Sequence, residues 1–414
     1  MLNFNLHTTT EIVFGKDIEE QIGPRLKELG AHRILVHFGG SSARTSGLLD
    51  RVEKSLFAAS LAFVELGGVS PNPKVSLVRK GIALAEREGI DFVLAVGGGS
   101  VIDSAKAIAV GAHYDGDVWD FFETKRLKAI AMGVATKTDP WQFASTGTKP
   151  DTTLPVGTVL TLAASGSESS NSCVLTNEET KEKRGITSET NRPRISFLDP
   201  ENTYTVSKFQ TGCGIVDIMM HTLERYLTPE GGENDITDRI AEGLLIAVRD
   251  AGRRAIANPR DYEARASLMW AGSVSHNDYT GCGRKRLFPV HKLEHELSAF
   301  RDEIAHGAGL SVLFPAWALY EMENDFPRFA QLANRVFGVE MDFHHPERTA
   351  REGILTMKRF FEEIGMPTHL SQLGIKPENY AQLAANTVRT VKGPVKSYSA
   401  LDEQAIIEIY KLAE

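Results

Sequence analysis

The sequence has few cysteines, and they form no arrangement that carries chemistry. Only Cys173, Cys213 and Cys282 occur among 414 residues, and no two of them form a Cys-x-x-Cys pair. An odd number of isolated cysteines argues against a disulfide framework and against a thiolate metal site. Reactive or metal-binding side chains are therefore to be sought among the carboxylates and imidazoles.

Long apolar runs and an excess of positive charge are also missing. No stretch of about 18 or more consecutive apolar residues exists, so no membrane-spanning helix is predicted. The 54 acidic residues outnumber the 46 basic ones and give a net charge of −8, which argues against nucleic acid or an anionic membrane as a partner. The first residues lack the charged and apolar segments of a signal peptide. These absences favour a cytoplasmic enzyme with a small-molecule substrate.

Apolar patterning divides the chain into two parts. Up to about residue 205, predicted strands alternate with predicted helices; the strands cover residues 33–38, 61–66, 91–96 and 156–161, and the helices cover 18–29 and 74–88. Such alternation is typical of a parallel sheet with helices on both faces. Only helices follow, at residues 211–226, 235–256, 262–276, 289–300, 306–321 and 348–364. We predict an α/β domain over residues 1–205 and an all-α domain over residues 206–414, with a long surface loop at residues 125–153.

A glycine-rich turn is the most informative feature of the first part. A predicted buried strand leads through Gly97, Gly98, Gly99 and Ser100 directly into a helix. Glycine lets the backbone turn sharply and approach a ligand, and the free amides at a helix start attract a pyrophosphate. The pattern is not Gly-x-Gly-x-x-Gly. By itself it therefore leaves a dinucleotide loop and a ligand-free turn equally open.

A second loop follows the strand at residues 33–38 and bears on cofactor choice. It begins with Gly39, Gly40, Ser41 and Ser42. An NAD enzyme usually has an acidic residue here that binds the ribose 2′-hydroxyl, but none occurs between Phe38 and Gly47. Hydroxyl groups and the guanidinium of Arg44 suit a 2′-phosphate, although Arg44 could equally be a solvated surface charge. We predict NADP(H) in preference to NAD(H).

Acidic and imidazole side chains at helical spacing predict a metal site in the second part. Asp217 and His221 are four residues apart, and so are His291 and His295, with His306 eleven residues further on. Residues four apart share one face of a helix. Imidazoles with a carboxylate suit Fe²⁺ or Zn²⁺ better than Ca²⁺ or Mg²⁺, although each pair alone is more often structural. The remaining histidines show no such grouping and are interpreted as structural or surface residues: His7, His32, His37, His113, His276, His344, His345 and His369.

These motifs, taken in order, resemble one family over nearly the whole chain. The matching segments are IVFG at 12–15, GVSPNP at 68–73, GGGSVIDSAKAIA at 97–109, TLAASGSE at 161–168, DIMMHTLERY from 217, and HKLEHELSAF with IAHGAGL. The chain resembles the iron-containing, group III alcohol dehydrogenases. Within them it is similar to the NADP-preferring branch of butanol dehydrogenases and aldehyde reductases.

The resemblance implies roles for individual residues. It implies an N-terminal dinucleotide domain, a helical metal domain and a cleft that holds cofactor and substrate. The four metal ligands would be Asp217, His221, His291 and His306. The pyrophosphate loop would be Gly97, Gly98, Gly99, Ser100 and Asp103, the nicotinamide and its ribose would lie near Thr161, Ser165 and Ser170, and the 2′-phosphate would bind Gly39, Gly40 and Ser42, with Ser41 in place of a usual glycine. His295 and Lys183 would face the reacting groups, with His295 either relaying a proton or orienting a ligand.

Two departures and three alternatives remain open. His295 and His306 are one residue further apart than in the family pattern, and the segment before His291 differs from it. Arg284, Lys285, Arg286 and Lys292 lie close together in sequence, which leaves open a polyol- or glycerol-type dehydrogenase acting on anionic substrates, or a lyase of the same fold. A metal- or nucleotide-binding protein without turnover is the third alternative. The segment at residues 2–7 is predicted to be an edge strand, and since exposed edges tend to be paired, a homodimer is expected.

Overall fold

The computed structural model describes residues 1–122, 153–180 and 182–414. Its contacts define two compact units. The α/β unit comprises Thr8–Thr161 and Ser167–Asn202, and the helical unit comprises Met1–His7, Leu162–Gly166 and Thr203–Glu414. The loop predicted at residues 125–153 lies, apart from Thr153, outside the described residues.

The α/β unit is built on a parallel sheet of six strands in the order β1-β8-β5-β4-β2-β3. The strands are β1 Glu11–Phe14, β2 Arg33–Phe38, β3 Ala62–Leu66, β4 Phe92–Gly97, β5 Val156–Leu160 and β8 Ile195–Leu198. All six residues of β4 are buried, as expected for a parallel strand covered on both faces. A separate antiparallel hairpin joins β6 Ser172–Asn177 to β7 Glu182–Thr187.

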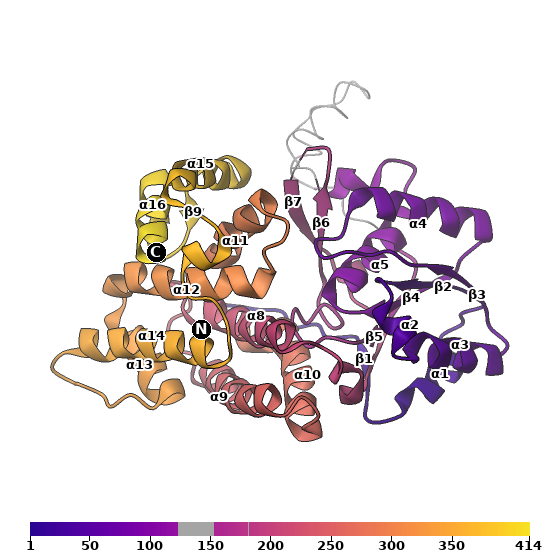
Figure 1. Cartoon of the computed structure of the whole chain (residues 1–414), viewed down its shortest axis with the longest axis horizontal. Helices are drawn as coiled ribbons and strands as arrows, with labels where there is room; N and C mark the ends of the chain where they lie inside the picture. Colours follow the sequence, from indigo (N-terminus) through magenta and orange to yellow (C-terminus); the bar gives the residue numbers. More distant parts are fainter. Residues whose placement is uncertain (123–152, 181) are drawn as a thin grey trace. The chain divides into compact units, whose positions relative to one another are not determined.

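Helices cover this sheet, as Figure 1 shows for the indigo-to-violet part of the chain. They are α1 Ile22–Glu28, α2 Ser42–Thr45, α3 Leu48–Ala58, α4 Val75–Glu88 and α5 Gly99–Gly111. α1 and α3 contact each other and form one core with the sheet, to which Ile34 and Val36 of β2 contribute, whereas α4 packs on α5. The predicted fold class is therefore confirmed for this part. β1, β8 and the hairpin were not predicted.

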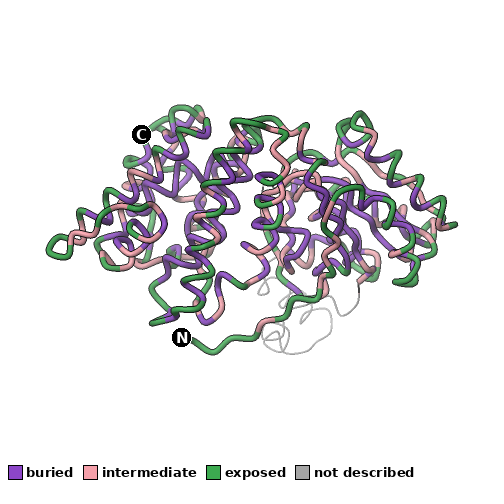
Figure 2. The backbone as a smooth tube through the Cα atoms, turned by 90° about the horizontal axis from the view of Figure 1, so that it is seen from below, coloured by how far each residue is buried: buried purple, intermediate pink, exposed green. Residues whose placement is uncertain are grey.

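The helical unit consists of nine α-helices among the described residues. They are α8 Lys208–Tyr226, α9 Asp235–Ala257, α10 Tyr262–His276, α11 Pro289–Phe300, α12 His306–Glu321, α13 Phe326–Phe337, α14 Pro346–Glu363, α15 Tyr380–Val391 and α16 Glu403–Leu412. A short antiparallel pair links β9 Val395–Lys396 to β10 Ala400–Leu401. α8 contacts α9, α10 and α12 and is buried over most of its length. Figure 2 colours the buried residues of the chain purple.

The first residues of the chain do not form the strand that their pattern predicts. No strand begins before Glu11, and the exposed stretch before it is irregular. Its backbone is held instead by the amide of Leu2, which donates to the carbonyl of Gly283 at 2.9 Å. The expectation of an edge strand at residues 2–7 was therefore wrong, because this segment pairs with a loop of the helical unit and not with a sheet.

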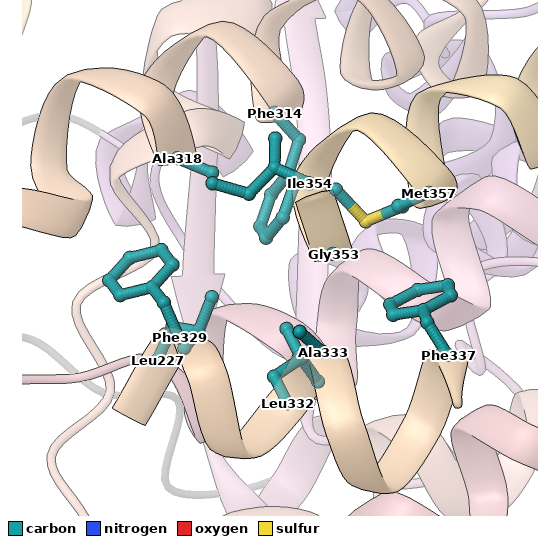
Figure 3. A pocket seen from close by; sticks show the side chains of 10 residues that line it. All are labelled: Leu227, Phe314, Ala318, Phe329, Leu332, Ala333, Phe337, Gly353, Ile354 and Met357. Atoms are coloured by element: carbon teal, nitrogen blue, oxygen red, sulfur yellow. The ribbon is translucent and has the colours of Figure 1, made fainter. Parts of the chain in front are cut away.

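The helical unit contains a small cavity that does not qualify as a binding site. The cavity lies in the core between α12, α13 and α14 and is lined entirely by apolar or small residues such as Phe314, Phe329 and Ile354 (Figure 3). The cavity has room for about one water-sized sphere and offers no side chain that could orient a substrate, so it is a packing gap. Among the described residues, no helix is both long and apolar enough to cross a membrane.

Candidate metal centre and dinucleotide loops

The helix α8 supplies the first two predicted metal ligands from one face. Ser207 caps its start by accepting a hydrogen bond from the amide of Gln210 at 3.1 Å. Two turns further on, Asp217 and His221 lie four residues apart, and the Oδ1 atom of Asp217 is 3.5 Å from Nδ1 of His221. Both residues are buried. The expected same-face pair is therefore present deep inside the helical unit.

Two more imidazoles reach the same carboxylate oxygen from α11 and α12. His291 lies in the first turn of α11, which Pro289 begins, and its Nε2 atom is 3.8 Å from Oδ1 of Asp217. His306 is the first residue of α12, and its Nε2 atom is 3.9 Å from the same oxygen. The link at residues 301–305, which contains the additional residue between His295 and His306, is not helical.

Glycine explains how α12 comes close enough to α8. A Cβ atom on Gly307 would lie 2.2 Å from the carbonyl oxygen of Cys213, and one on Gly309 would lie 2.6 Å from the side chain of Glu294. Either contact is far inside van der Waals range, so a larger residue would push α12 away. Gly307 and Gly309 therefore allow α12 to pack closely enough for His306 to lie near Asp217.

The arrangement suits a metal ion: ligand atoms of Asp217, His291 and His306 lie within 4.8 Å of one another, and Nδ1 of His221 lies 3.5 Å from Oδ1 of Asp217. Three of these atoms, Asp217 Oδ1, His221 Nδ1 and His291 Nε2, are buried and have no hydrogen-bond partner. Buried polar atoms without partners are costly, which points to a ligand that satisfies them. In a tetrahedral site with metal–ligand bonds of about 2.1 Å, neighbouring ligand atoms lie about 3.4 Å apart. The 3.5–3.9 Å separations from Asp217 Oδ1 are close to this value.

Two glutamates that sequence reasoning missed orient the imidazoles. Glu224 of α8 contacts Nδ1 of His291, and Glu294 of α11 contacts Nδ1 of His306, and both carboxylates are fully buried. A carboxylate can only accept, so each ring donates from Nδ1 and keeps the lone pair of Nε2 for a metal. Glu224 also accepts from the amide of Val290 at 2.6 Å, which ties α8 to the start of α11.

The electrostatics of the cluster favour a cation. Burial alone would raise the pKa of Asp217, but the neighbouring His221, His291 and His306 hold it well below its usual range. Burial likewise would lower the pKa of His291, yet Glu224 and Asp217 raise it to about 9. The charges that attract a proton to His291 also attract a divalent metal ion. The pKa of His221 is lowered well below its ordinary value, chiefly by burial and next by His276.

Two other histidines border the four-atom set. His295 is half-buried one turn after His291, and its ring centroid lies 5.6 Å from that of His306. His276, at the end of α10, has its ring centroid 4.1 Å from that of His221 in an edge-on arrangement. The interpretation of His276 as lying outside any histidine group was therefore wrong. It was missed because it belongs to a helix distant in sequence from both predicted pairs.

The glycine-rich loops lie side by side in the α/β unit. β4 ends at Gly97 and α5 begins at Gly99, while β2 ends at Phe38 and α2 begins at Ser42. β2 and β4 are adjacent in the sheet, and β3 lies on the far side of β2. Successive strands are therefore added on opposite sides of β2, and the switch point of the sheet lies between β2 and β4. A doubly wound sheet binds its ligands at the carboxyl ends of the strands at such a switch point.

The two loops differ in how closely their glycines are packed. A Cβ atom on Gly97 would lie 2.5 Å from the side chain of Val101, whereas one on Gly40 would meet nothing within 4 Å. The carbonyl of Gly39 accepts from the amide of Gly68 at 2.8 Å, so the segment after β3 is tied to the loop after β2. Thr161, also predicted to contact the cofactor, donates its amide to the carbonyl of Gly97 at 3.2 Å.

Other predicted cofactor residues have contacts inside the protein. The Asp103 carboxylate accepts from Ser167 Oγ at 2.6 Å and from the amide of Val174 at 3.1 Å. Ser170 is buried, and its carbonyl accepts from the fully buried Nζ of Lys106 at 3.0 Å. Lys183 is half-buried on β7 opposite Thr176. Asp103 and Ser170 therefore tie α5 to the segment before β6.

Ser165 belongs to the short Leu162–Gly166 segment of the helical unit and is half-buried. A Cβ atom on Gly166 would lie 2.4 Å from the carbonyl oxygen of Gly272 and 2.7 Å from the Cβ of His276. This places the segment directly against α10, beside the histidine cluster. Ser165 is therefore the chain neighbour of a glycine that contacts His276.

Three of the four basic residues around the start of α11 pair with carboxylates, and the fourth, Lys292, donates to a backbone carbonyl. Arg284 pairs with Asp238, Lys285 lies 2.6 Å from Glu230, and Arg286 lies 2.5 Å from Asp278. The Lys292 ammonium donates to the carbonyl of Leu287 at 2.7 Å. This cluster therefore offers little net positive charge to an anionic substrate.

Comparison with known proteins places both halves of the chain in one family. The family model described as iron-containing alcohol dehydrogenase matches residues 9–200. The model for the C-terminal region of the Fe-containing alcohol dehydrogenase family matches residues 211–413. The two matches together cover almost all of the sequence.

Individual relatives agree with the family models. NADH-dependent butanol dehydrogenase A of Clostridium acetobutylicum is 37% identical over 412 residues, covering 99% of each chain. NADPH-dependent aldehyde reductase YqhD of Escherichia coli is 34% identical over 377 residues, covering 91% of this chain and 90% of the relative. The crystal structure of NADH-dependent butanol dehydrogenase A from Thermotoga maritima has a TM-score of 0.90 at 35% identity and covers 100% of this chain and 99% of its own.

Proposed function

We propose, from the premise that the chain belongs to the iron-containing alcohol dehydrogenase family, that it interconverts short-chain primary alcohols and aldehydes with a nicotinamide dinucleotide. The observation that carries the proposal is that one nitrogen atom from each of three imidazoles lies 3.5–3.9 Å from Oδ1 of the buried Asp217. The chain also has a glycine-rich loop of its own at the switch point of a parallel sheet.

The donor set fits a divalent transition metal, Fe²⁺ or Zn²⁺. Asp217, His221, His291 and His306 would hold the ion, and the buried atoms without partners support this assignment. When bound, such an ion acts as a Lewis acid on the substrate oxygen, and a bound nicotinamide supplies the hydride chemistry.

The chain's own residues would orient the ligands and move the proton. The buried carboxylate of Glu224 fixes the ring of His291, and that of Glu294 fixes the ring of His306, so that Nε2 of each points at Asp217. His295, which is half-buried near His306, would carry the alcohol proton towards solvent. A purely orienting role for His295 is the alternative, and Lys183 remains a predicted contributor.

The dinucleotide would lie along the loops that end β2 and β4, with the pyrophosphate at the start of α5. Gly97, Gly98, Gly99 and Ser100 would form this part of the site. The loop after β2 has no acid of its own, which supports NADP(H) over NAD(H). The structure tempers this support, because Arg44 forms an ion pair with Glu65. Four relatives named as NADH-dependent or probable NADH-dependent butanol dehydrogenases are 35–38% identical to this chain, and the relative named as NADPH-dependent is 34% identical.

A dehydrogenase for anionic substrates is less well supported. Such a substrate would need unpaired basic side chains beside the ligands, and the basic residues before α11 are paired with carboxylates or a carbonyl. A binding protein without turnover has no specific observation in its favour. We therefore retain one function and treat the others as outcomes of its test.

The test is aldehyde reduction by protein of measured Fe²⁺ or Zn²⁺ content, followed as NADPH or NADH oxidation with butyraldehyde. We expect turnover that a chelator abolishes and added metal restores. Absence of turnover with a panel of aldehydes, by protein that holds its metal and binds a dinucleotide, would contradict the proposal. Turnover confined to phosphorylated or polyol substrates would select the alternative dehydrogenase. A homodimeric assembly and a cytoplasmic location remain predictions from the sequence.

A further inference from the structure

A small charged cluster lies beside the loop that ends β2. Arg44 of α2 pairs through Nη2 with Glu65 of β3, and its Nη1 lies 3.9 Å from Oε1 of Glu53 on α3. The guanidinium also lies over the ring of Phe38, 5.6 Å from its centroid. Arg44, which is three residues after Ser41, therefore faces two carboxylates, those of Glu53 and Glu65.

Sheet register explains why Glu65 is present at this loop. β2 and β3 are parallel, and Val36 is paired with Glu65. The segment after β3 then follows the loop after β2, where the amide of Gly68 bonds the carbonyl of Gly39 at 2.8 Å. Glu65 is thus held next to the predicted 2′-phosphate loop by the sheet, although it is distant from that loop in sequence.

The cluster is poorly suited to further negative charge. Burial and the neighbouring Glu65 raise the pKa of Glu53, while Arg44 lowers it. The side chain of Arg44 is 49% exposed and that of Glu65 is 34% exposed, so both are within reach of a ligand at the loop. A 2′-phosphate that recruits Arg44 must compete with Glu65 and lie close to its charge.

We propose that Glu65 determines dinucleotide selectivity by holding Arg44 in an ion pair, and so weakens NADP(H) binding relative to NAD(H). The inference rests on the proposed function, because it assumes that a dinucleotide binds these loops. It does not require either cofactor to be preferred outright. A ribose with a free 2′-hydroxyl would not meet this charge penalty, and its hydroxyl can donate to a carboxylate.

The variant Glu65→Gln tests the proposal because it removes the charge and frees Arg44 while keeping the size of the side chain. One unit charge acting on a phosphate dianion at roughly 8 Å, in a dielectric between that of water and a protein surface, changes affinity on the order of tenfold. We therefore expect the ratio of Kd for NADH to Kd for NADPH to rise about tenfold, measured by fluorescence titration at low salt.

Matched variants separate charge from structure. Glu65→Asp keeps the charge and should keep the wild-type ratio to within about threefold. Glu88→Gln removes a carboxylate that pairs with Arg33 at the opposite end of β2, and should leave the ratio unchanged. The effect of Glu65→Gln should also shrink as salt is raised, since exposed charges are screened. Glu53→Gln should shift the ratio in the same direction by less, and provides a second route if Glu65→Gln folds poorly.

The outcomes are distinguishable. Binding of both dinucleotides with the same ratio in wild type, Glu65→Gln and Glu53→Gln would overturn this inference and leave the proposed function intact. Binding of neither dinucleotide by any of these proteins would overturn the proposed function and this inference with it. A raised ratio in Glu65→Gln but not in Glu88→Gln would support the inference.

Discussion

The substitution Glu224→Gln tests how far the buried glutamates maintain the metal centre. Glu224 accepts two hydrogen bonds, one from the amide of Val290 and one from Nδ1 of His291. A glutamine has one accepting oxygen, so its amide group must face one of these two donors. The His291 ring can avoid the clash by moving its proton to Nε2, which is the atom 3.8 Å from Asp217 Oδ1 and is then unable to bind a metal.

The expected cost follows from that change of tautomer. Loss of a carboxylate that orients a ligating histidine usually weakens metal affinity 10- to 100-fold, which is about 1.4–2.7 kcal/mol. Competition with a chelator of known affinity, for Zn²⁺ and Fe²⁺, measures it directly. The control is Glu242→Gln, which removes a buried carboxylate bonded to Tyr226 Oη at 2.7 Å in the same unit. Equal metal affinity in Glu224→Gln and wild type would refute the reasoning, as would an equal loss in the control.

Three further predictions concern the ligands, pH and assembly. His291→Ala and Asp217→Ala should lose the metal and activity, whereas His295→Ala should retain most of the metal and lose about 10- to 100-fold in kcat; metal kept in His291→Ala but lost in His295→Ala would reverse the assignment. His37 is buried on β2, bonds Leu66 and Ser104, and has its pKa lowered to about 4, mainly by burial. Below pH 6.5 the unfolded chain therefore binds a proton that the folded chain excludes, so this residue should reduce the free energy of unfolding by up to about 3 kcal/mol as pH falls from 6.5 towards 4. Denaturant unfolding of wild type and His37→Gln measures this, and an identical pH dependence in the two proteins would count against it. Light scattering at micromolar concentration should give a homodimer, and a monomer would contradict the sequence-based expectation.

Much of the fold could be predicted, because buried strands appear in the sequence as apolar runs and helices as apolar residues at helical spacing. The central strands β2, β4 and β5 are apolar runs, and long helices such as α9 and α10 show the expected spacing of apolar residues. β1 and β8 were missed because each has only four residues. α13 could have been found, since Asp325 caps its start and Pro327 lies in its first turn. The edge strand predicted at residues 2–7 does not form, because an alternating apolar pattern does not show which segment the backbone will pair with.

The candidate metal centre could be predicted where two of the proposed ligands share a helix. The four-residue spacing identified Asp217 with His221 and placed His291 on its own helix. It could not identify Glu224 and Glu294, although Glu224 is three residues after His221 and Glu294 is three residues after His291, because a helical face does not reveal which ring a carboxylate will meet. It also could not identify His276, which approaches His221 from α10.

Cofactor choice shows most clearly why a local window is insufficient. The NADP(H) prediction came from the absence of an acid between Phe38 and Gly47, and that absence is real. In a parallel sheet, however, the carboxyl end of the next strand lies alongside the loop, so residues from β3 enter the environment of a loop that follows β2. Glu65 enters in this way and pairs with Arg44, the cation on which the prediction relied. The charge next to the proposed 2′-phosphate position therefore depends on residues that follow β2 and on Glu65 of β3. It can be inferred only when the register between these two strands is known.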